Sequence, residues 1–386
     1  YFTGRFADRK RILRMISAVV ILVFFAIYCA SGMVAGARLF ESMFGMSYES
    51  ALWISAIATI SYVFIGGFLA VSWTDTIQAT LMIFALLLTP VVAVLSLGDM
   101  ATVHAALEVA RPQAYSLFSD LSAVAIISLI AWGLGYYGQP HILVRFMAAD
   151  SVKSIPNARR IGMVWMILCL GGAVAAGFFG IAYFQIHPEL AVTVNQNSET
   201  VFMELTKILF NPWIAGIVLA AILAAVMSTL SCQLLVCSST LTEDFYKAFI
   251  RKNASQKELV WVGRLMVLLI AVLAIALASN PGSQVLGLVA YAWAGFGAAF
   301  GPLILLSLFW KRMNLAGALA GMIVGAVVVI LWKNIPVFAD TKIYEIIPGF
   351  ISAMIAIIVF SLITRAPEQD VIDRFEEADR AYKDVS

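Results

Sequence analysis

The sequence predicts an all-α, polytopic membrane protein. Of its 386 residues, 62% are hydrophobic and only 12% are charged, and its mean hydropathy is +0.94, whereas a soluble domain carries about 25% charged residues. Ten segments also run apolar for about 20 residues, the length of an α-helix that crosses a bilayer. Lys and Arg residues gather in alternate connections between these segments. These observations exclude an ordinary soluble protein, a disordered chain and a disulfide-stapled secreted domain.

The ten predicted spans have few or no internal charges, and connections of varied length separate them. They are residues 15–37, 51–71, 76–97, 121–137, 161–183, 212–236, 259–279, 285–310, 313–332 and 346–364. Twenty of the 25 Lys and Arg residues lie before the first span, in alternate connections or at the adjoining span ends, and in the tail. Because basic connections stay in the cytoplasm, both termini of this chain are predicted to be cytoplasmic.

The remaining composition excludes several functions. Four cysteines, within or directly beside predicted spans, and three scattered histidines provide neither a disulfide framework nor a metal-ligand set. A net charge of +2 gives no reason to expect nucleic acid as a partner. Protease, hydrolase and nucleotide-binding motifs are missing, so we expect no enzyme activity and no organic cofactor. Few ionisable groups lie at membrane depth, so neutral oxygens, backbone dipoles and aromatic rings are expected to hold any ligand.

The first candidate site is residues 132–140, WGLGYYGQP, at the cytoplasmic half of the fourth span. Each glycine costs a helix about 1 kcal/mol and a proline about 3 kcal/mol, so the helix is predicted to break there. Broken helices at membrane depth are tolerated where they line a cavity. Trp132, Tyr136 and Pro140 are spaced to share one face, and Tyr28 lies mid-depth in the first span. The alternative is a kinked helix end with interfacial aromatic residues.

The second candidate site is in the span 212–236. Ala225, Ser228 and Thr229 are spaced i, i+3 and i+4, so one carbonyl and two hydroxyls converge on one helical face. Such neutral oxygens suit a small, hard cation such as sodium. The alternative is that Ser and Thr bond back to the preceding turn or join helices.

Two glycine-rich stretches complete the candidates. Residues 65–78, IGGFLAVSWTDTIQ, predict a tight cytoplasmic turn in which Asp75 could pair with an Arg to close an inner gate. The alternative is a structural turn with Asp75 near a helix N-terminus. The span 285–310 contains three glycines and Pro302 in its middle, and we expect it to be bent.

At these motifs the sequence resembles the sodium/solute symporter family. The resemblance covers essentially the whole chain, and it is carried by residues 65–78, 132–146 (WGLGYYGQPHILVRF), 210–235 and 291–302 (YAWAGFGAAFGP). The last three stretches look like the bacterial, proline-transporting branch of the family.

The resemblance implies an inverted-repeat fold of two five-helix units. It places the last three helices of the first repeat at 1–97, the complete second repeat at 98–310, two peripheral helices at 311–364 and a cytoplasmic tail at 365–386. The chain begins at Tyr1 rather than Met, and we expect that helices preceding it in a longer protein are absent here. Those helices would supply the remaining sodium ligands.

The resemblance further implies sodium-coupled symport of L-proline by alternating access across the bacterial inner membrane. Its partners are then L-proline, the sodium ion and membrane lipid, and the oligomeric state is left open. Carried over by position, Ala225, Ser228 and Thr229 hold sodium. The proline pocket is lined by Tyr28, Trp132, Tyr136 and Pro140, and the gating residues are Asp75 and Arg145. The alternatives are a sodium symporter for another solute, such as pantothenate or a sugar, and a membrane sensor that does not transport.

Overall fold

The computed structural model describes the backbone of residues 1–116, 118–119 and 121–383, and the side chains of these residues except 62, 65–70 and 381–383. All regular elements in this part of the chain are helices, as predicted. Eight of its segments are long and apolar enough to cross a membrane: Ile12–Phe44, Val71–Leu97, Val152–Ile186, Pro212–Ile250, Gln256–Ala278, Val285–Phe309, Leu315–Asn334 and Ile346–Ile363.

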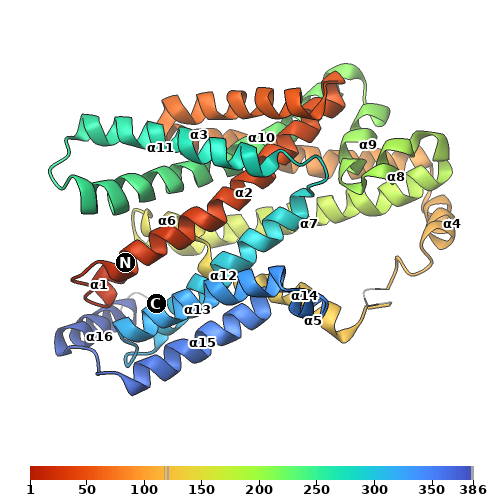
Figure 1. Cartoon of the computed structure of the whole chain (residues 1–386). Coiled ribbons are helices and arrows are strands. Elements are labelled where there is room, and N and C mark those ends of the chain that lie inside the picture. Colours follow the sequence, from red (N-terminus) through yellow and green to blue (C-terminus); the bar gives the residue numbers. More distant parts are fainter. Residues whose placement is uncertain (117, 120, 384–386) are drawn as a thin grey trace. The chain divides into compact units, whose positions relative to one another are not determined.

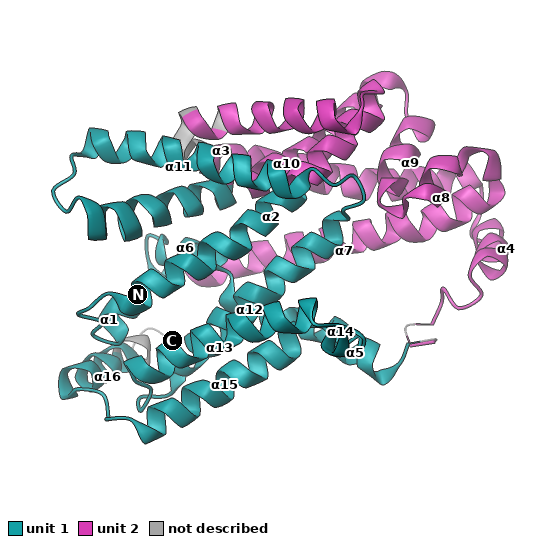
Figure 2. Cartoon of the chain, in the orientation of Figure 1, with its two compact units in different colours: residues 1–31, 121–154, 232–386 teal, residues 32–120, 155–231 magenta. Residues whose placement is uncertain are grey.

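The chain forms two compact units that alternate along the sequence (Figure 2). Unit 1 comprises residues 1–31, 121–154 and 232–386, and unit 2 comprises residues 32–120 and 155–231. Helices α2 (Ile12–Phe44) and α10 (Pro212–Ser239) pass from one unit to the other. This division concerns compactness and not repeat symmetry, so the domain boundaries expected from the sequence stay a prediction.

Unit 1 contains parts of α2 and α10 together with twelve further helical elements of the described chain (Figure 1). They are α1 (Phe2–Arg5), α5 (Ala123–Ile130), η1 (Ala131–Gly138), α6 (Pro140–Met147), η2 (Val152–Ser154), the π-helix η5 (Thr240–Ile250), α11 (Gln256–Ala278), α12 (Val285–Phe309), α13 (Leu315–Asn334), α14 (Pro336–Ala339), α15 (Ile346–Ile363) and α16 (Gln369–Lys383).

Helix α12 forms the most buried part of unit 1, because its glycines let neighbours approach closely. A Cβ atom at Gly297 would lie 2.6 Å from Cδ1 of Ile346, and one at Gly301 would lie 2.7 Å from Cε2 of Phe350. The helix is continuous through Pro302. These glycines therefore serve close packing, and the proline does not interrupt the helix, so the bend expected here stays a prediction.

Helices α13 and α15 run side by side in unit 1 (Figure 1). The Asn314 side chain caps α13 by accepting a hydrogen bond of 2.9 Å from the Gly317 backbone N–H, which satisfies one of the free N–H groups of the first turn. Its amide also donates to the Arg365 carbonyl at 2.7 Å, so the start of α13 is fixed to the end of α15.

Unit 2 contains the rest of α2 and α10 with α3 (Tyr48–Leu97), α4 (Met100–Ala110), α7 (Ile155–Ile186), η3 (Pro188–Leu190), α8 (Val192–Gln196), η4 (Ser198–Thr200) and α9 (Val201–Leu209). The short helices α4 and α9 pack on the end of α7 through a buried cluster that includes Leu107, Phe184 and Leu205. The hydropathy pattern predicted neither short helix, because each lies in a connection between spans.

Helix α3 differs from the prediction. The spans 51–71 and 76–97 were expected to be separated by a turn, but the helical assignment runs without a break from Tyr48 to Leu97. A straight helix of this length would measure about 75 Å, against about 30 Å for the hydrocarbon core, so the segment has enough residues for two crossings. The glycine pair Gly66–Gly67 of the expected turn lies outside the described side chains.

Candidate functional site

The helix break predicted at residues 132–140 is confirmed. Helix α5 gives way to a 3₁₀ helix at Ala131–Gly138, Gln139 is extended with φ −80° and ψ 111°, and a new α-helix begins at Pro140. Proline suits the first position of a helix because it has no N–H to lose and its φ is fixed. The new helix begins without a side-chain cap, and the N-terminus of a helix favours negative charge.

Trp293 of α12 holds two of the predicted substrate residues. Its ring stacks on that of Trp132 at 5.5 Å and 17°, and meets the Tyr136 ring edge-on at 4.8 Å. Its indole N–H donates a 2.9 Å hydrogen bond to the Trp132 carbonyl. This close approach requires glycine at position 135, where an added Cβ would overlap the Trp293 indole. The three rings form an aromatic cluster, which we call the Trp293 cluster.

Gln139 ties the same break to α12. Its side chain is fully buried, and Nε2 donates to the Gly135 carbonyl at 3.0 Å and to the Trp293 carbonyl at 3.3 Å. Two carbonyl acceptors fix which end of the amide is nitrogen. The one sign of this role in the sequence is the position of Gln139 in the 132–140 motif. Its partner Trp293 lies 154 residues away, so no local pattern shows the contact.

The other two predicted substrate residues meet around His141. The Tyr28 ring lies 5.9 Å from the His141 ring at 76°, and Phe25 lies 5.6 Å from the same ring. Pro140 directly precedes His141 at the start of α6. All four predicted substrate residues thus belong to unit 1, where two contact Trp293 and the other two lie beside His141. No role was predicted from the sequence for Trp293, Gln139 or His141.

Tyr344 backs the Trp293 cluster from the connection between α14 and α15. Its ring stacks on Trp132 at 6.0 Å and 18°, and its hydroxyl donates to the Ala290 carbonyl at 2.7 Å. Burial raises the pKa of the Tyr344 hydroxyl above its ordinary value, so the group stays a neutral donor. No motif in the sequence marked this residue.

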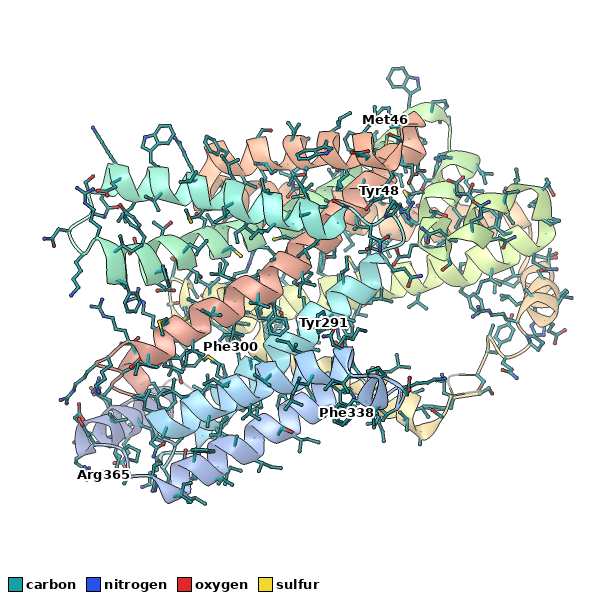
Figure 3. The ribbon with its side chains drawn as sticks, in the orientation of Figure 1. Met46, Tyr48, Tyr291, Phe300, Phe338 and Arg365 are labelled. Atoms are coloured by element: carbon teal, nitrogen blue, oxygen red, sulfur yellow. The ribbon has the colours of Figure 1, made fainter. Side chains whose placement is uncertain are left out.

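Two cavities lie at opposite ends of the α13–α15 pair. The residues that line them are not the predicted substrate, sodium or gating residues. One, of about 550 Å³, lies beside Trp332, Lys333 and Glu345. The other, of about 450 Å³, lies beside Asn314, Arg365 and Val371. Figure 3 shows Phe338 near the first end and Arg365 at the second.

The predicted sodium residues lie on α10 within unit 2. The Ser228 hydroxyl donates to the Ala225 carbonyl at 3.1 Å, which is the local bond that Ser commonly makes in membrane helices. This bond uses the hydroxyl hydrogen, so the lone pairs of the Ser228 oxygen remain available to a cation. Thr229, the next residue on this face, is exposed. These three residues offer hard, neutral oxygens, which fit sodium.

The two predicted gating residues lie in different units. Arg145, on α6 in unit 1, donates from Nη2 to the Cys232 sulfur at 2.7 Å, and Asp75 lies within α3 in unit 2. Their gating roles stay a prediction.

Comparison with known proteins identifies the family. Residues 1–325 match the model of the "Sodium:solute symporter family". The chain is 67% identical to the "Sodium/proline symporter" of Escherichia coli (strain K12) over 99% of its own length and 76% of that protein. It is 50% identical to the "High-affinity proline transporter PutP" of Bacillus subtilis (strain 168), over 98% of this chain and 78% of that protein.

A solved structure supports the fold. It is titled "Substrate-bound outward-open state of a Na+-coupled sialic acid symporter reveals a novel Na+-site", and it matches with a TM-score of 0.75. The match covers 96% of this chain and 77% of that chain at 20% sequence identity, so it bears on the fold alone. The family match and the sequence identities together show that this chain belongs to the sodium:solute symporter family.

Proposed function

We propose that the protein couples sodium entry to the uptake of L-proline across the bacterial inner membrane by alternating access. The observation that carries this function is the broken helix at Gln139–Pro140 with the Trp293 cluster packed around it, in a chain 67% identical to a sodium/proline symporter. The function is transport and not catalysis, because the family consists of symporters.

The substrate site follows from the chemistry of proline. Its ring is apolar and its secondary ammonium is cationic, and both suit contact with the aromatic rings of Trp132 and Tyr136. Its carboxylate suits the N-terminus of α6, which begins at Pro140. Tyr28 closes the set beside His141. We assign proline binding to these residues.

The ion site is assigned to Ala225, Ser228 and Thr229. A sodium ion takes several oxygen ligands, so carbonyls from other segments complete it. Coupling requires that sodium bind better to the state that also binds proline. One charge moving inward across 100 mV gains about 2.3 kcal/mol, which supports roughly fiftyfold accumulation of proline at about 1.4 kcal/mol per tenfold.

The remaining assignments concern orientation and gating. Basic residues gather in alternate connections, so both termini of this chain are placed in the cytoplasm. Asp75 and Arg145 are assigned to the cytoplasmic gate. The last three helices of the first inverted repeat are assigned to 1–97 and the complete second repeat to 98–310, followed by two peripheral helices at 311–364 and the tail at 365–386.

Uptake of radiolabelled L-proline into proteoliposomes, with and without an inward sodium gradient, tests this function. Accumulation should require the gradient and collapse when a sodium ionophore is added. Uptake that ignores sodium would overturn the ion coupling. Uptake of pantothenate or a sugar in place of proline would overturn the substrate. The same assay tests the substrate site with the Trp132→Ala variant, which removes a ring assigned to proline binding. Trp213→Ala is its control, because Trp213 is 87% exposed.

A further inference from the structure

The larger of the two cavities, of about 550 Å³, lies within unit 1 and outside the residues assigned to proline, sodium or gating. Its volume falls within the range of about 300–1,000 Å³ that is typical of small-molecule sites. The residues lining it lie in the last turn of α13, on α14 and in the connection that leads to α15.

Two polar groups of this cavity are buried without a hydrogen-bond partner. The Glu345 side chain is 8% exposed, and its Oε1 accepts no hydrogen bond from the described residues. Nζ of Lys333 lies 4.0 Å from this oxygen, beyond hydrogen-bond distance. The indole N–H of Trp332 also lacks an acceptor among the described residues, although its ring is fixed by stacking on Phe338 at 4.8 Å and 9°. Burying a carboxylate without partners destabilises a protein, so stability alone does not explain a glutamate at this position.

The charges beside the cavity match those of a zwitterion. Glu345 provides one negative charge, and Lys333 and Lys342 provide two positive charges. An α-amino acid carries an ammonium that suits the glutamate, and a carboxylate that suits a lysine and the Trp332 indole N–H. A simple anion would leave the buried carboxylate unpaired, and a simple cation would leave the buried N–H unpaired. One zwitterion satisfies both.

Tyr344 joins this cavity to the Trp293 cluster. It lines the cavity, its ring stacks on Trp132 at 6.0 Å, and its backbone N–H donates to the Ser128 hydroxyl of α5 at 3.1 Å. In the assigned orientation, the basic pair at 311–312 places the start of α13 in the cytoplasm and its other end outside. A ligand that arrives from outside and enters this cavity is therefore one aromatic residue away from the proposed proline site.

We propose that this cavity is an outer binding site for L-proline, which holds the amino acid on the extracellular side before it reaches the Trp293 cluster. The Glu345 carboxylate accepts hydrogen bonds from the secondary ammonium of proline. The proline carboxylate pairs with Lys342 and accepts a hydrogen bond from the Trp332 indole. This site rests on the proposed function and adds a second proline site to it.

Thiol labelling tests the outer site directly. Ala339 is exposed and lines the cavity, so Ala339→Cys places a reactive thiol there without removing a charge. L-proline should slow the reaction of this thiol with a membrane-impermeant reagent, and N-acetyl-L-proline, which lacks the ammonium, should not. The native cysteines are buried or half-buried, so the wild-type chain measures the background.

The protection must come from the outer site and not from the inner one. Adding Tyr136→Ala removes a ring of the inner site but leaves Trp132 and Tyr344 in place. Protection by proline should survive this change. Its loss would show that proline acts on the introduced thiol from the inner site, and would overturn the inference.

Glu345→Gln removes the negative charge and keeps the shape of the side chain. It should raise the proline concentration needed for half-maximal protection at least about tenfold, the loss expected for one charge-assisted hydrogen bond. The matched control is Asp340→Asn, the same change at an exposed carboxylate of the same connection that does not line the cavity. This control should leave the protection unchanged.

Lys342→Asn gives a second measure that does not depend on a buried side chain. Lys342 is exposed, and asparagine tolerates its φ of 57°, so this variant should fold and still weaken the protection. Protection that is unchanged in Lys342→Asn would overturn the inference even if Glu345→Gln fails to fold.

A lipid headgroup is the other source of a zwitterion. Phosphatidylethanolamine joins an ammonium to an anionic phosphate, so labelling is compared in liposomes with and without this lipid. Protection by the lipid and none by proline would overturn the inference. Wild-type protein without sodium-dependent uptake would instead overturn the proposed function, and the labelling result distinguishes the two failures because it needs no transport.

Discussion

The Trp293 cluster leads to a sharp prediction, because two glycines of the same 3₁₀ helix differ completely in their surroundings. A Cβ atom added at Gly135 would overlap the Trp293 indole, whereas one added at Gly133 would meet nothing within 4 Å. Neither glycine has the positive φ that would strain an alanine. Gly135→Ala and Gly133→Ala therefore make the same chemical change, and only the first displaces Trp293.

The expected loss follows from the contacts that Trp293 makes. Displacement breaks its hydrogen bond to the Trp132 carbonyl, its stacking on Trp132 and its edge contact with Tyr136. A hydrogen bond contributes about 1 kcal/mol and each aromatic pair about 0.5–1.5 kcal/mol. Their sum is about 2–4 kcal/mol, of which about 1.4 kcal/mol appearing in binding would weaken proline affinity tenfold.

Equilibrium binding of labelled proline to the purified variants measures this loss, with thermal unfolding measured in parallel. Gly135→Ala should bind proline at least about tenfold more weakly, and Gly133→Ala should bind it like wild type. If both variants bind proline equally well, Trp293 does not position Trp132 and Tyr136 for the substrate, and the site must be assigned elsewhere.

Three further predictions concern the ion, the substrate and a helix cap. Thr229→Ala should raise the sodium concentration needed for half-maximal uptake without impairing folding, because Thr229 is exposed; unchanged sodium dependence would remove α10 from the ion site. Trp132→Ala should weaken proline binding more than sodium binding, and equal losses would indicate a packing role. The Thr102 backbone N–H holds the pKa of the capping Asp99 below its ordinary value. The start of α4 should therefore lose protection from hydrogen exchange as the pH falls through that lowered pKa, and Asp99→Asn should remove this pH dependence.

Local composition was sufficient to predict most of the spans and the helix break, although eight segments of the described chain, against ten predicted, are long and apolar enough to cross a membrane. Apolar runs of about 20 residues identify membrane helices directly, and three glycines with Pro140 act on the backbone at their own positions. Where the outcome depends on partners, composition gives less. The bend expected at Pro302 stays a prediction, since α12 is continuous through it, and the close packing of its glycines against Ile346 and Phe350 could not be predicted from composition.

The tertiary partners of the break could not be predicted for the same reason. Trp293 donates to a carbonyl 161 residues away, and no hydropathy period or local motif encodes that contact. Gly135 looked like a helix breaker in the sequence, whereas in the structure it is the position that admits an indole ring. A residue's local propensity and its tertiary role are separate properties, and the sequence of one chain displays only the first.

The buried Gln139 shows how one side chain can join a local break to its tertiary partner. Its Nε2 donates to the Gly135 carbonyl within the broken segment and to the Trp293 carbonyl on α12. Removing its amide leaves both buried carbonyls without this donor, at a cost of about 1–3 kcal/mol for an unsatisfied buried group. The helix break and proline binding should therefore be disturbed together, because Trp293 also holds Trp132 and Tyr136.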